Sequence, residues 1–235
     1  MVRGASAVLG LYGAALAYLL LAPSIPAVHD PQSAAMAAGG AGALLLGGCA
    51  GVCVPAGDSR YVLVFALLGA ALVVGGADAA NAGAWVSVFE ALLYGLIGAG
   101  FARVLDTAAL ALALPLFAAA VDAATVLGGG PGALSQAAPP RGDPLTLDLP
   151  AWGGGSVGHI GIVDMVFLGA FAAYARRHGL RFGAACLGMA LGLAAAFVVQ
   201  VAAGRAIPAL PFLAAGMLLP NTDRLGSLLG RAVRG

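Results

Sequence analysis

Apolar residues run in long blocks along this 235-residue chain, and short polar or Gly/Pro-rich segments separate the blocks. A helix needs about 20 mostly apolar residues to cross a bilayer, and the blocks divide into stretches of that order. We therefore predict an all-α polytopic membrane protein with about eight transmembrane helices, over residues 5–24, 34–55, 61–77, 82–102, 107–127, 157–175, 182–203 and 207–221.

The amino-acid composition is typical of an integral membrane protein. Hydrophobic residues make up 61% and charged residues 9%, whereas a soluble domain carries about 25% charged residues. The 37 glycines suit helices that approach one another closely in a bilayer. Cys49, Cys53 and Cys186 lack the His or Cys neighbours of a zinc site, so we interpret them as packing residues and expect neither metal nor cofactor.

The arginines predict an orientation, and the chain has no lysine. With eight spans, Arg141 and Arg205 fall on one side and nine arginines fall on the other, which the positive-inside rule makes cytoplasmic. We expect an integral protein of a prokaryotic plasma membrane with both termini in the cytoplasm. The nine are Arg3, Arg60, Arg103, Arg176, Arg177, Arg181, Arg224, Arg231 and Arg234.

The longest connection, residues 128–156, is predicted to lie outside. It begins as a flexible Gly/Pro-rich run, and then alternates apolar and polar residues between Pro144 and Pro150, a pattern typical of one short strand. The segment is either a solvated linker or a strand edge that pairs with an extended substrate. In the second interpretation Leu147 contacts the substrate.

Two aspartates, Asp122 and Asp164, lie inside apolar segments. A carboxylate there costs roughly 2.5–3.5 kcal/mol on insertion scales, so such residues are rare and usually functional. We place Asp122 about five residues and Asp164 about seven residues inside the outer ends of consecutive antiparallel spans, roughly 8–11 Å deep at 1.5 Å per residue. Pro208-Ala209-Leu210 opens the last span from the same side.

Paired carboxyls at one depth suit peptide hydrolysis. Two neighbouring carboxyls cannot both ionise, so the pair holds one proton. The ionised member then takes a proton from water while the protonated member polarises the scissile carbonyl. Removal of either carboxyl should relieve repulsion and stabilise the fold. The prolines near residue 208 are expected to leave unpaired carbonyls around a wet cavity, or else to open a simple helix N-terminus.

These residues resemble the presenilin and signal peptide peptidase family of intramembrane aspartyl proteases. That family has an aspartate in one helix, a Gly-x-Gly-Asp motif at the next, and Pro-Ala-Leu at the start of its last helix. The corresponding segments here are Val121-Asp122, Gly161-Ile162-Val163-Asp164 and Pro208–Leu210. Val163 replaces the second glycine of the motif, Val121 replaces the usual tyrosine, and eight helices replace nine.

The resemblance implies a catalytic pair formed by Asp122 and Asp164, with Gly161, Val163 and the Pro-Ala-Leu segment contacting the substrate. It also implies a presenilin-like bundle oriented as in signal peptide peptidase. Its expected partners are transmembrane peptides and the lipid bilayer, not nucleic acid. The expected organisation is four helices over 1–105, the Asp122 helix over 106–127, the loop over 128–156, the catalytic helices over 157–221 and a cytoplasmic tail over 222–235.

Other functions fit parts of this pattern. A proton-coupled transporter would use Glu90, near the middle of the fourth predicted span, in a relay with the two aspartates. The chain shows no repeat with paired broken helices, which many transporters have. A prepilin-peptidase-type enzyme would place its aspartates near the cytoplasmic face. An inactive family member would bind peptides without cutting them. His159, before Asp164, is either a structural residue or a pH sensor.

Overall fold

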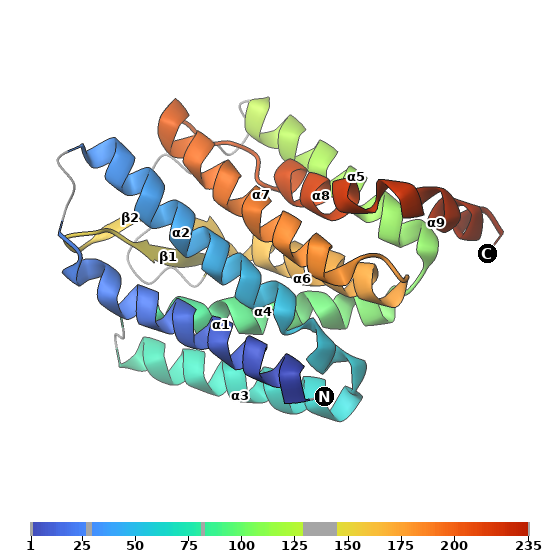
Figure 1. Cartoon of the computed structure of the whole chain (residues 1–235), viewed down its shortest axis with the longest axis horizontal. Helices are drawn as coiled ribbons and strands as arrows, with labels where there is room; N and C mark the ends of the chain where they lie inside the picture. Colours follow the sequence, from blue (N-terminus) through green and yellow to red (C-terminus); the bar gives the residue numbers. More distant parts are fainter. Residues whose placement is uncertain (1, 27–29, 81–82, 129–144, 235) are drawn as a thin grey trace.

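The computed structural model describes residues 2–26, 30–80, 83–128 and 145–234 and consists mainly of helices packed side by side in one bundle (Figure 1). Two short strands form a hairpin at one end of this bundle. The helices are α1 Val2–Leu21, α2 Pro31–Val52, α3 Arg60–Ala79, α4 Ser87–Val104, α5 Ala108–Leu127, α6 Ile162–Arg177, α7 Phe182–Ala203, α8 Leu210–Leu218 and α9 Thr222–Arg234, and the strands are β1 Thr146–Pro150 and β2 Ser156–Gly161.

Six of the helices are long and apolar enough to cross a membrane: α1, α2, α3, α4, α5 and α7. Large apolar side chains cover their outer faces, among them Phe65 and Leu72 on α3, which are 72% and 76% exposed. Soluble monomers rarely expose apolar faces of this kind, so these faces are consistent with contact with lipid. The chain is therefore an all-α polytopic membrane protein in its broad class. The two remaining predicted spans correspond to α6, with 16 residues, and α8, with nine.

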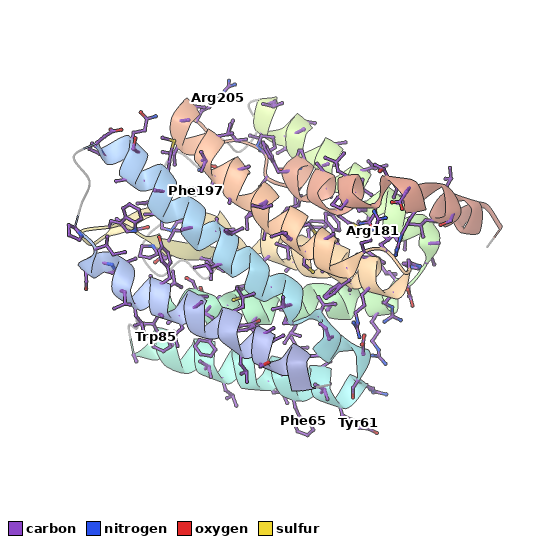
Figure 2. All side chains as sticks on the ribbon, in the orientation of Figure 1. Tyr61, Phe65, Trp85, Arg181, Phe197 and Arg205 are labelled. Atoms are coloured by element: carbon purple, nitrogen blue, oxygen red, sulfur yellow. The ribbon has the colours of Figure 1, made fainter. Side chains whose placement is uncertain are left out.

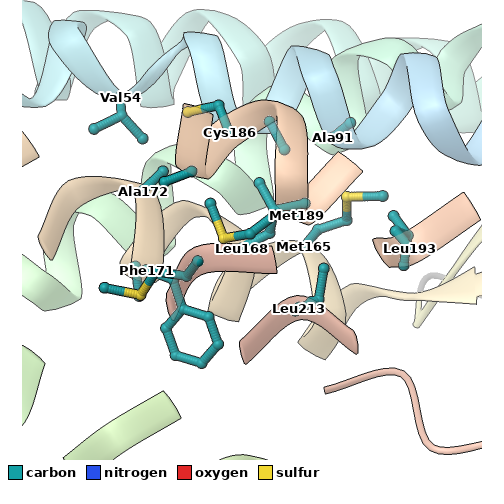
Figure 3. Packing of buried hydrophobic residues seen from close by; sticks show 14 of the residues in the cluster. Val54, Ala91, Met165, Leu168, Phe171, Ala172, Cys186, Met189, Leu193 and Leu213 are labelled. Carbon is teal, nitrogen blue, oxygen red and sulfur yellow. The ribbon is translucent and has the colours of Figure 1, made fainter. Parts of the chain in front are cut away.

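Small residues bring the helices of the core together. A Cβ added at Gly169 on α6 would collide with the backbone of Gly95 on α4, and a Cβ added at Gly98 on α4 would collide with the α6 backbone at Val166. Gly188 on α7 and Gly216 on α8 meet in the same way. Met165, Leu168, Phe171, Met189 and Leu213 fill the space between the helices (Figure 3). Glycines permit this approach because they have no side chain to separate the two backbones. The close approach increases the van der Waals contact that helps to hold helices together in lipid.

The structure corrects the prediction for residues 144–161. The predicted strand is present as β1, but residues 157–161, assigned to a helix, belong to β2, which pairs with β1 in an antiparallel hairpin. The helix that carries Asp164 consequently begins at Ile162. Leu147 and Leu149 on β1 point into the core and are fully buried. Residues 129–144 of the predicted loop lie outside the described residues.

The arginines of the described residues separate between the two ends of the bundle. Arg205 lies at the end that carries the hairpin, and Arg181 lies at the opposite end (Figure 2). We call these the hairpin end and the arginine-rich end. Ion pairs join connections at the arginine-rich end: Arg176 with Asp58, Arg177 with Asp106, and Arg181 with Asp223. Residues 222–234 form the helix α9, where a tail was predicted, and its Leu228 is buried.

Candidate active site

Asp122 lies five residues before the end of α5, as predicted, and accepts a hydrogen bond from another helix. The backbone N–H of Leu210, the first residue of α8, donates to Asp122 Oδ2 over 2.9 Å. The first N–H groups of any helix have no partner within that helix. Asp122 therefore caps α8, and the positive end of the α8 dipole stabilises a carboxylate at this position.

The Pro-Ala-Leu segment forms a simple helix start. Ala209 is the N-cap residue of α8, and Pro211 occupies the first turn, where a missing N–H costs nothing. The Ala209 carbonyl accepts from the N–H groups of Phe212 and Leu213 at 3.0 and 3.1 Å. The expected unpaired carbonyl is thus absent at Ala209. The segment instead provides a hydrogen-bond donor for Asp122, the backbone N–H of Leu210.

Asp164 is the third residue of α6, two residues inside the start of the helix, whereas about seven residues were predicted. Gly161 is the N-cap residue of α6, and the Asp164 carboxyl lies directly against it. The third helical residue is the position from which a side chain can reach back to the N-cap amide in a capping box. The strand β2 and the helix α6 meet at this point, so the hairpin places Asp164.

The carboxyls of Asp122 and Asp164 lie close enough to influence each other. Asp164 interacts electrostatically with Asp122, although 42 residues separate them in the chain. Both are half-buried. Each lies at the N-terminus of a helix, Asp164 on α6 and Asp122 against α8, where the backbone N–H groups favour negative charge. Two ionised carboxylates at these positions would repel each other.

Gly161 and Val163 occupy different environments beside Asp164. A Cβ at Gly161 would lie 3.3 Å from Asp164 Oδ2, which is tight enough to disturb the carboxyl. The side chain of Val163 is 55% exposed and points away from the core. The position where this chain departs from the family motif therefore leaves the packing of the Asp164 carboxyl unaffected. Val121, before Asp122, is also exposed.

The prediction that Leu147 contacts a substrate is wrong, because its side chain is completely buried and its backbone lies opposite Ile160 of β2. The backbone of β1 remains relevant. Ile162 donates its N–H to the Leu145 carbonyl, and hydrogen-bonded pairs alternate along an antiparallel ladder. Leu147 therefore directs its backbone groups toward β2, whereas those of Thr146 and Asp148 point away from it.

His159 has a structural contact, one of the two predicted roles, whereas Glu90 lies at a different depth from the prediction. His159 Nδ1 lies 2.6 Å from Asp148 Oδ1 on the neighbouring strand, so it ties the hairpin together. Glu90 lies in the first turn of α4 instead of mid-span, and it is 9% exposed. The alternation that predicted β1 placed Asp148 on a strand. The contact with His159 was not predictable, because the residues of β2 were assigned to the following helix.

Within the described residues, no group of three or more His, Cys, Asp and Glu side chains is arranged to hold a metal ion. Cys49, Cys53 and Cys186 are free thiols buried between helices. The cavities found near the arginine-rich end include an open one of about 330 Å³ lined by Asp58, Arg103, Asp106 and Arg177. It lies far from the two aspartates along the helices.

No protein family model matches the chain, and no curated protein or solved structure is significantly similar to it.

Proposed function

We propose that the protein is an intramembrane aspartyl endopeptidase that hydrolyses peptide bonds within transmembrane segments or signal peptides. The observation that carries this proposal is the meeting of Asp122 with Asp164 and with the Leu210 N–H, at the start of the Pro-Ala-Leu helix. Helix caps alone would explain each carboxyl separately. They do not explain why two caps from different helices share one site, where their mutual repulsion opposes folding.

The mechanism uses the shared proton of the pair. The ionised carboxylate removes a proton from a water molecule, and the water oxygen attacks the scissile carbonyl carbon. The protonated carboxyl donates a hydrogen bond to the carbonyl oxygen, where negative charge develops. When the tetrahedral intermediate collapses, the C–N bond breaks and the leaving amine takes a proton from a carboxyl. The Leu210 amide holds the Asp122 carboxyl in place throughout.

The substrate must unwind before this attack, because a helix hides its carbonyls within its own hydrogen-bond ladder. Exposed backbone groups cost several kcal/mol each in lipid unless they find partners. The backbone of Asp148 on β1 points away from β2 and offers a place for an extended segment to pair at the hairpin end. Substrates with helix-breaking residues near that end should therefore be cut fastest.

The proposal includes the finer topology. Helices α6 and α8 would complete eight spans in a presenilin-like bundle, with the hairpin shortening the path that α6 must cover. The arginine-rich end would face the cytoplasm of a prokaryote, by the positive-inside rule. The two aspartates would then open toward the outer side, in the orientation of signal peptide peptidase.

The direct test is cleavage of a generic transmembrane reporter by the purified protein in detergent and in liposomes. The expected result is a cut within the apolar segment that a transition-state-mimicking aspartyl inhibitor blocks. Cleavage that a metal chelator blocks and the aspartyl inhibitor leaves intact would contradict the proposal.

A further inference from the structure

The helices that carry the two aspartates have different packing partners. Within the described residues α5 packs chiefly against α8 and α9, whereas α6 packs chiefly against α4. Direct contact between α5 and α6 is sparse. The relative placement of Asp122 and Asp164 must therefore depend on contacts elsewhere along these helices.

One such set of contacts lies at the arginine-rich end, where the last turn of α6 holds the connection between α4 and α5. Arg177 pairs with Asp106, through Nε at 2.9 Å and Nη2 at 2.5 Å from Oδ2. His178 Nε2 lies 3.3 Å from Asp106 Oδ1. Tyr174 donates its hydroxyl to the Leu105 carbonyl over 2.9 Å. We call these five residues the Asp106 clamp.

The clamp holds the start of α5. Thr107, which directly follows Asp106, is the N-cap residue of α5, and its side chain accepts from the Leu110 N–H. The Arg177 guanidinium beside Asp106 lowers the pKa of that carboxyl, so it stays ionised at neutral pH. Two guanidinium N–H groups of Arg177 converge on Asp106 Oδ2 while His178 faces Oδ1, so the carboxylate is held from both oxygens. The position of the α5 N-terminus is thus determined by α6.

The other end of α5 has its own attachment, the Asp122–Leu210 hydrogen bond. Pro115 lies between the two attachments, inside the helix. Proline removes one backbone hydrogen bond and is the commonest cause of a helix kink. Because α5 can bend at Pro115, contacts on both sides of the proline are needed to fix the position of the whole helix relative to α6.

We propose that Asp106 is a positioning residue, which acts through Arg177 and His178 to set the placement of α5 against α6 and hence of Asp122 against Asp164. This inference rests on the proposed function for its catalytic consequence. Asp106 lies at the opposite end of α5 from the dyad and contacts neither carboxyl. A misplacement of about 1 Å far from the chemistry can cost on the order of 100-fold in rate.

The test compares two ion pairs on the same turn of α6. Asp106→Ala removes the link to α5, whereas Asp58→Ala removes the Arg176 link to the α2–α3 connection and serves as the matched control. Spin labels on Ala124→Cys and Val163→Cys, both exposed, report the distance between α5 and α6. The background carries alanine at Cys49, Cys53 and Cys186. Asp106→Asn, which keeps an oxygen acceptor, is measured in parallel in case the alanine variant does not fold.

The expected result is a broader distance distribution for Asp106→Ala than for the parent. Asp106→Asn should broaden the distribution less, and Asp58→Ala should leave it unchanged. In the cleavage assay, kcat should fall about tenfold for Asp106→Ala while KM stays within about twofold, because binding groups are untouched. The charge swap Asp106→Arg with Arg177→Asp should restore the narrow distribution and bring kcat within about threefold of the parent.

An Asp106→Ala distribution and kcat indistinguishable from those of Asp58→Ala would overturn the clamp. So would a charge swap that restores neither quantity. A parent protein that cleaves no reporter refutes the proposed function, and the distance measurement then decides alone whether Asp106 places α5.

Discussion

Leu210 donates its backbone N–H to the carboxyl of Asp122, a residue 88 positions earlier in the chain. The bond links the start of α8 to the C-terminal part of α5 and supplies a cap that the sequence of α8 lacks. It also changes an expectation about stability. Removal of the Asp122 carboxyl relieves repulsion with Asp164, but it leaves a helix N–H without its acceptor.

The first prediction concerns this cap. Asp122→Ala should lower the free energy of unfolding by about 1–3 kcal/mol, the cost of a buried donor that loses its partner. Asp122→Asn keeps an oxygen acceptor and loses the charge, so it should be at least as stable as the wild-type protein. Thermal unfolding in detergent measures both variants. Equal stability of the alanine and asparagine variants would show that the hydrogen bond is unimportant.

The second prediction separates Gly161 from Val163. Gly161→Ala places a methyl group against Asp164 Oδ2 and should lower kcat about tenfold, since the displaced carboxyl is misaligned. Val163→Ala changes an exposed side chain and should leave kcat within about twofold. The rate of reporter cleavage under saturating substrate decides between them. A larger loss for Val163→Ala would mean that this side chain touches the substrate.

The third prediction uses two neighbouring leucines. Leu147 is completely buried, so Leu147→Ala should destabilise the fold by about 2–5 kcal/mol. Leu145 is 61% exposed two residues earlier, and Leu145→Ala should change stability by less than about 0.5 kcal/mol. Thermal unfolding in detergent is the measurement. A stable Leu147→Ala variant with a raised KM would return Leu147 to the substrate site.

The fourth prediction tests orientation. In a background with alanine at the three native cysteines, Arg205→Cys at the hairpin end should react with an impermeant thiol reagent in intact cells. Gly183→Cys at the arginine-rich end, also exposed in the structure, should react only after permeabilisation. The positive-inside rule is the reason for this asymmetry. The reverse pattern would place both aspartates near the cytoplasmic face.

Much of the bundle followed from hydropathy alone. The six span-length helices match predicted stretches because a helix in lipid must be apolar over its whole length. The position of Asp122 near the end of α5 and the helix start at Leu210 were also predictable, since proline marks a helix start. These features depend only on residues close together in the chain.

The hairpin was only half predictable. Residues 156–161 continue directly into the apolar residues of α6, and a short apolar run does not distinguish a strand from a helix. The depth of Asp164 was misjudged as a result. The alternation in β1 predicted a strand but not its partner, so Leu147 was assigned to pairing with a substrate and not with β2. Contacts such as Asp148–His159 and Asp58–Arg176 depend on tertiary packing, which local patterns do not contain.

The central claim is that Asp122 and Asp164 act as one catalytic pair, and single carboxyl-to-amide variants test it most directly. Asp122→Asn and Asp164→Asn, each with an unchanged thermal midpoint, are compared with Glu90→Gln as a buried-acid control in the purified reporter assay. The account predicts that both aspartate variants lose all measurable cleavage while Glu90→Gln retains most of it. Near-normal turnover by either aspartate variant, or loss of activity in Glu90→Gln alone, would contradict it.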